Sequence, residues 1–77
     1  MTLFSLGFQL VGHAIENLDI DEFGCGLRCL RNERCRSYNS IADGYHGNVT
    51  CEISDHTRKS SLQSLKHNED STYHGKG

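Results

Sequence analysis

Four cysteines are the feature of this 77-residue sequence that most constrains its fold. Cys25, Cys29 and Cys35 lie within eleven residues of one another, and Cys51 follows further along the chain. A chain this short makes one domain, and it buries too small a fraction of its surface for an apolar core alone to stabilise it securely. Cross-links through the cysteines are therefore expected, and their even number favours disulfides in an oxidising compartment.

Zinc coordination and thiol chemistry are the alternatives for these cysteines. The spacing Cys25-x3-Cys29-x5-Cys35-x15-Cys51 lacks the two-residue knuckle of structural zinc sites, and no suitably spaced histidine pair lies near it. A catalytic thiol would need a partner base, and the sequence singles out none. We therefore expect the five histidines to be solvated, on loops and strand ends: His13, His46, His56, His67 and His74.

Helix geometry narrows the cysteine pairing without fixing it. Cys25 and Cys29 are four residues apart in a predicted helix, where Cβ atoms lie about 5–6 Å apart. A disulfide requires roughly 3.5–4.5 Å, so each of the two must bond to a cysteine outside the helix. The nested pairing, Cys25–Cys51 with Cys29–Cys35, and the crossed pairing, Cys25–Cys35 with Cys29–Cys51, both meet this condition.

The helix is predicted to run from the N-cap Asp21 through about Arg31. An acidic first turn and arginines near the end suit the helix dipole. Gly24 and Gly26 weaken a helix of about ten residues so much that docking on the rest of the fold must hold it in place. Asn32 suits the turn after the helix, where a left-handed residue is common.

The remaining elements are predicted to be strands. Apolar residues at positions 4, 6, 8 and 10 indicate a half-buried strand, and Ile15 lies out of phase in the next one, which predicts a bulge. The extended segments expected are residues 3–10, 13–20, 35–41, 50–54 and, as a short edge strand, 72–73. The expected core includes Phe4, Leu6, Phe8, Leu10, Val11, Phe23, Leu27, Leu30, Ile53 and Leu62. The pattern predicts an α+β fold with one helix packed on a sheet.

Composition argues against several functional classes. A net charge of −2 and a pI near 6.2 give no electrostatic basis for binding nucleic acid or an anionic membrane. The longest apolar run, residues 1–12, is too short to insert across a bilayer and lacks the features of a secretory signal. Since no catalytic motif is recognisable, we expect a protein that is not an enzyme and needs no cofactor.

Three motifs together resemble the PAN/apple family: Phe8-x-Leu10-x-Gly12-His13, then Cys25-x3-Cys29-x5-Cys35-x-Ser37-Tyr38-Asn39, then Cys51-Glu52-Ile53. The similarity covers about residues 6–75 and is most specific in its middle. It implies an antiparallel sheet of about five strands that cradles one helix, with the nested disulfides Cys25–Cys51 and Cys29–Cys35. Apple domains add a third bridge between the termini. This chain has no cysteines for that bridge, so it is similar to the four-cysteine members.

The resemblance also implies a biological setting. Residues 1–77 would form one PAN/apple-like domain, excised from a larger extracellular protein that is secreted or displayed on a cell surface. Such a domain would bind another protein or a glycan without a cofactor. The alternative is a structural adhesion or matrix unit that binds no small ligand. As an isolated domain it is expected to be a monomer.

Two surface features are candidates for binding. The first is a basic patch for a sulfated glycan, because arginine side chains match sulfate oxygens well; it would consist of Arg28, Arg31, Arg34 and Arg36. The alternative is a solvated helix face that Glu33 partly neutralises. The second is the loop 43–48, where Tyr45 would contact a protein partner. The sequon Asn48-Val49-Thr50 in this region predicts N-glycosylation of Asn48.

Overall fold

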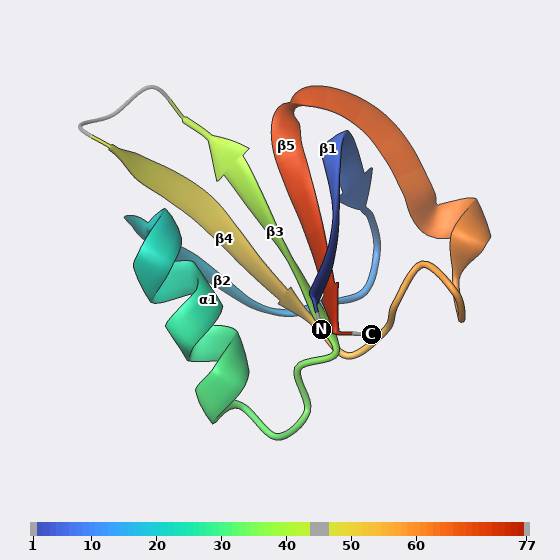
Figure 1. The fold of residues 1–77 in the computed structure, drawn as a ribbon, viewed down its shortest axis with the longest axis horizontal. Coiled ribbons are helices and arrows are strands. Elements are labelled where there is room, and N and C mark those ends of the chain that lie inside the picture. Colours follow the sequence, from blue (N-terminus) through green and yellow to red (C-terminus); the bar gives the residue numbers. More distant parts are fainter. Residues whose placement is uncertain (1, 44–46, 77) are drawn as a thin grey trace.

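One α-helix and one five-stranded sheet dominate the part of the chain that the structure describes. The computed structural model describes residues 2–43 and 47–76. Its elements are β1 (Thr2–Leu10), β2 (Ala14–Asp21), α1 (Glu22–Arg31), β3 (Ser37–Ala42), β4 (Asn48–Ser54), the short 3₁₀ helix η1 (Leu62–Ser64) and β5 (Leu65–Lys76). The strands form an antiparallel sheet in the order β1-β5-β3-β4-β2, and α1 packs on β2, β3 and β4 (Figure 1). The predicted α+β architecture is confirmed.

The helix begins and ends where the sequence predicts. The Asp21 carboxylate accepts a hydrogen bond from the Gly24 amide at 3.2 Å and caps the first turn. A Cβ at Gly24 would lie 2.8 Å from Asp21 Oδ1, so a side chain there would displace the capping carboxylate. Within the described residues no helix is long and apolar enough to cross a membrane.

Asn32 does not adopt the left-handed conformation expected of it. Its φ of −100° and ψ of 111° are extended. Its side-chain oxygen accepts a hydrogen bond from the Arg34 amide at 2.9 Å, and its carbonyl accepts one from the Cys35 amide, also at 2.9 Å. The chain therefore turns directly toward Cys35, because the disulfide to Cys29 must close within a few residues.

Two disulfides join the helix to the rest of the molecule, and they have the nested pairing. Cys25 bonds to Cys51 in β4, with 5.6 Å between the Cα atoms, and Cys29 bonds to Cys35 just before β3, with 5.3 Å. All four sulfur atoms are paired, so the zinc or thiol alternative for these cysteines is wrong. The cysteines and Ile53 form the buried core, against which Ile15, Leu18, Ile20 and Tyr38 pack.

The opposite face of the sheet is held by a buried amide. Asn39 accepts a hydrogen bond from the Leu10 amide at 3.0 Å and donates one to the Leu10 carbonyl at 2.9 Å. The Asn39 amide also donates to Glu52 Oε1 at 3.0 Å, and Gln9 donates to the same oxygen at 2.8 Å. These bonds tie the end of β1 to β3 and β4.

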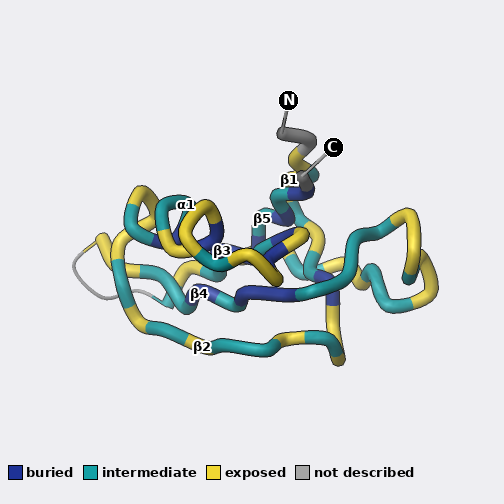
Figure 2. Tube along the Cα trace, turned by 90° about the horizontal axis from the view of Figure 1, so that it is seen from below, coloured by how far each residue is buried: buried dark blue, intermediate teal, exposed yellow. Residues whose placement is uncertain are grey.

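The segment between β4 and β5 lies on this same face. The Arg58 amide donates to Tyr73 Oη at 2.9 Å, and its guanidinium donates to Ser5 Oγ at 2.9 Å. The His13 and His56 rings stack with their centres 4.1 Å apart. Figure 2 shows α1 lying over β3 and β4, with buried positions along the helix.

Two predictions about the strands are wrong. Residues 72–73 are not a short edge strand, because β5 is twelve residues long and lies between β1 and β3. The edge strands are β1 and β2, and in β1 the side chains of Phe4, Leu6 and Phe8, which were expected in the core, are exposed while Leu10 is buried. The short helix covers only the β2, β3 and β4 side of the sheet, so it does not reach them. The predicted bulge at Ile15 is confirmed by a register shift there.

Removing Cys25–Cys51 should destabilise the domain more than removing Cys29–Cys35, because the two bonds close loops of different length. Their sequence separations are 26 and 6 residues. In the chain-entropy model the losses are about 3.5 and about 2 kcal/mol. Urea unfolding of the two paired Cys→Ala variants measures both values. Equal losses, or a larger loss for the short loop, would contradict this account.

Candidate functional site

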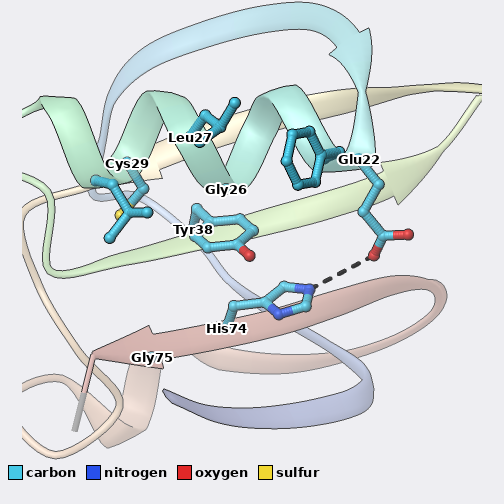
Figure 3. A pocket seen from close by; sticks show the side chains of 9 residues that line it. Glu22, Gly26, Leu27, Cys29, Tyr38, His74 and Gly75 are labelled. Atoms are coloured by element: carbon cyan, nitrogen blue, oxygen red, sulfur yellow. Dashed lines mark ion pairs between the residues drawn. The ribbon is translucent and has the colours of Figure 1, made fainter. Parts of the chain in front are cut away.

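An apolar groove separates α1 from β5 on the helix face of the sheet. We call it the aromatic groove and define it by Phe23, Leu27, Leu30, Tyr38 and His74. It encloses a volume of about 250 Å³. In Figure 3, Leu27 comes from the helix, whereas Tyr38 and His74 come from two neighbouring strands.

The floor of the groove is a row of aromatic rings. Tyr38 and His74 are directly paired across β3 and β5, and their rings stack with 4.4 Å between centres and 7° between planes. Phe4 in β1 is paired with His74 on the side of β5 away from Tyr38, with 6.1 Å between ring centres. A Cβ on Gly26 would lie 3.2 Å from Tyr38 Oη, so glycine at this helix position lets the tyrosine ring lie close to the helix.

The helix side of the groove carries two large apolar residues that were expected in the core. Phe23 is 75% exposed and Leu30 is 72% exposed. With Leu27 they are spaced at i, i+4 and i+7, which is the spacing of one helix face. Cys25 and Cys29 form the adjacent face, which points to the sheet, so this second stripe is left beside β5.

One end of the groove is polar. The Glu22 carboxylate lies 3.7 Å from His74 Nε2 and accepts a hydrogen bond from Ser40 Oγ at 3.2 Å. Burial lowers the pKa of His74 below its ordinary value of 6.5, and Glu22 partly opposes this shift. Burial raises the pKa of Tyr38 above its ordinary value of 10.0, with a further contribution from Glu22. Both rings are therefore uncharged at neutral pH.

The arginines predicted to form a patch are only partly gathered. Three of them line a second, wider groove of about 660 Å³ between α1 and β2: Arg28, Arg31 and Arg34. Arg28 forms an ion pair with Glu16 at 2.7 Å, and Arg34 lies 3.6 Å from Asp55. Arg36 is exposed but does not line this groove. Carboxylates from β2 and from the end of β4 therefore neutralise two of the four.

The predicted contact loop is described only in part. Tyr45 lies outside the described residues, so its role stays a prediction. Asn48 is the first residue of β4 and is exposed. Glycosylation of Asn48 also stays a prediction.

His74 was not expected in a functional site. It was predicted to be solvated, but its side chain is only 16% exposed. The sequence carries a signal for one half of the groove, the helical spacing of Phe23, Leu27 and Leu30. It carries none for the other half, because the contact between His74 and Tyr38 depends on how distant strands pair.

Replacing Glu22 with Gln should lower the pKa of His74 further, because the carboxylate favours the protonated ring. An NMR titration of the His74 ring protons measures the shift, and Glu33→Gln, past the far end of the helix, is the control. An unchanged or higher pKa would contradict the proposed contact.

Because the folded-state pKa of His74 is already depressed, this histidine should also make the domain less stable as the pH falls below about 6.5.

Comparison with known proteins agrees with this architecture. The family model described as the PAN domain matches residues 4–77. Neither the curated proteins nor the solved structures gave a match. The match spans nearly the whole chain, and the observed helix, sheet and disulfides are those that the resemblance implied. The chain therefore belongs to the PAN domain family.

Proposed function

We propose that this chain is a non-catalytic extracellular module that binds a partner protein through the aromatic groove. PAN domains are known as modules that bind proteins or carbohydrates and are generally not enzymes. Two disulfides in a chain of this size also favour an extracellular setting. The observation that carries the proposal is the exposure of Phe23 and Leu30 along a concave, aromatic-floored surface.

The size and chemistry of the groove favour a protein over a carbohydrate. Its volume of about 250 Å³ is below the range of about 300–1,000 Å³ that is usual for small-molecule sites. This space suits an apolar side chain that projects from a partner as an anchor. The polar groups that line the groove for a sugar hydroxyl come from Glu22, Tyr38 and His74, and its helix side, formed by Phe23, Leu27 and Leu30, offers none. The two disulfides already hold the helix that carries these residues in place. Less conformational entropy is therefore lost when a partner binds them.

The Glu22 carboxylate at the polar end of the aromatic groove indicates which residues a partner would carry. Glu22 is exposed on the helix side of the groove, and His74 beside it is uncharged at neutral pH. A lysine or arginine next to the apolar anchor would form a charge-assisted hydrogen bond with this carboxylate. The proposed ligand is therefore a protein segment with an aromatic or aliphatic side chain close to a basic one.

A random peptide library displayed on phage, selected on the immobilised domain, tests this proposal. Selected peptides should combine an apolar anchor with Lys or Arg. The variant Phe23→Ser/Leu30→Ser should bind them at least tenfold more weakly, because truncating an anchor contact typically costs more than 1 kcal/mol. The matched control is Leu62→Ser, since Leu62 is 70% exposed but lies in η1, outside the groove.

Three results would contradict the proposal. One is selected peptides that bind the double variant as well as the wild type. Another is an NMR titration in which methyl galactoside, and none of the selected peptides, shifts the signals of Tyr38 and His74; this would favour a carbohydrate. If no peptide is selected at all, the alternative of a structural adhesion unit is favoured.

A sulfated glycan is the second candidate ligand, at a different site. It is favoured by the gathering of Arg28, Arg31 and Arg34 around one groove. It is disfavoured by the ion pairs that Glu16 and Asp55 already form with two of these arginines. Since exposed ion pairs are weak, a polysulfate could still compete for them.

A heparin column tests the second candidate. If the site exists, Arg31→Ala/Arg34→Ala should elute at clearly lower salt than the wild type, because sulfate contacts release counterions. Lys59→Ala/Lys66→Ala removes the same number of charges from exposed positions outside this groove and is the control. Elution of the wild type at or below physiological salt, or equal shifts for both variants, would exclude the arginine site.

A further inference from the structure

The two edges of the sheet differ in charge. β2 carries Glu16, Asp19 and Asp21, whereas residues 2–10 of β1 contain no charged residue and no proline. Natural sheets protect their edges from pairing with other chains by charges, proline, short strands or bulges. The β2 edge has this protection. The β1 edge is nine residues long, and its protection is limited to an irregularity beside Gly7, where two steps along β1, from Leu6 to Phe8, accompany five steps along β5, from Thr72 to His67.

The same strand exposes large apolar side chains. Phe4 is 62% exposed and Leu6 is 73% exposed, both on the helix face of the sheet. Gly7 has a φ of +80°, and the register of β1 against β5 shifts between Leu6 and Phe8. The straight part of the free edge is therefore residues 2–6.

We propose that β1 pairs antiparallel with β1 of a second copy of this chain, around a two-fold axis perpendicular to the sheet. A strand without charges meets no like charge when it pairs with itself, and the two-fold places Phe4 and Leu6 of the two copies side by side. Association stops at two copies, because the other edge is acidic. The result is one continuous sheet with both helices on the same face.

The size of this contact sets its strength. Taking about 200 Å² for a large apolar side chain, Phe4 and Leu6 expose on the order of 250 Å² per copy, or roughly 500 Å² per pair, against about 1,200–2,000 Å² for a standard interface. Main-chain hydrogen bonds between the paired edges add to this. The dimer is therefore weak and forms reversibly in the micromolar range or above, which differs from the monomer expected from the sequence.

Sedimentation velocity of the folded domain, from about 5 to about 500 μM, tests the proposal. The wild type should shift from monomer to dimer across this range. Leu6→Lys should remain monomeric, or dimerise at least tenfold more weakly, because it places like charges at the edge. Leu62→Lys is the matched control: it adds the same charge at a residue that is 70% exposed in η1, and it should dimerise like the wild type.

Hydrogen exchange provides a second measurement that needs no variant. In the wild type, amides of residues 2–6 should become more protected as concentration rises, while those of β2 should not. A wild type that stays monomeric at every concentration would overturn the proposal. So would a dimer that Phe23→Lys disrupts and Leu6→Lys leaves intact, because the contact would then lie at the aromatic groove. The edge pairing does not depend on the groove having a ligand.

Discussion

The disulfide between Cys25 and Cys51 is the constraint on which the rest of the structure depends. A ten-residue helix with two internal glycines is marginal in water, and here a covalent bond fixes it on β4. The second bond, from Cys29 to Cys35, fixes the other end and leads the chain into β3. Much of the buried core is sulfur. The bonds thus do what a larger apolar core does in a longer chain, and they set the distance between the helix and β5 from which the aromatic groove arises.

Local signals predicted local features well. The N-cap Asp21, the helix end at Arg31 and the bulge at Ile15 each depend on a few neighbouring residues, and each was correct. The nested cysteine pairing came from the family resemblance, since helix geometry alone left the crossed pairing open. β5 was missed because its polar side chains give no apolar alternation, although its main chain pairs on both sides. The exposed face of β1 was missed because alternation shows that a strand has two faces but not whether anything covers them.

In the candidate site, too, features that depend on neighbouring residues were predictable and features that depend on distant strands were not. The stripe of Phe23, Leu27 and Leu30 is visible in the sequence, but their exposure is not, because it depends on where a short helix stops covering the sheet. The contact between Tyr38 and His74 needs the register of strands that are distant in the chain. The arginines are easily counted in the sequence, but the carboxylates that neutralise Arg28 and Arg34 come from β2 and from the end of β4. Charge counting therefore overstated the basic patch.

The side chain of Asn39, which is buried on the sheet face opposite α1, restricts which residue types the chain accepts at this position. Both hydrogen bonds between Asn39 and Leu10 are made to main-chain atoms of Leu10, its N–H and its carbonyl. Any residue except proline can supply this donor and acceptor, so with respect to these bonds position 10 tolerates almost every replacement. Position 39 does not, because aspartate lacks the donor and leucine lacks both groups. The hydrogen bonds therefore restrict the residue type at position 39, whereas at position 10 the restriction comes from the burial of the Leu10 side chain, which is 2% exposed.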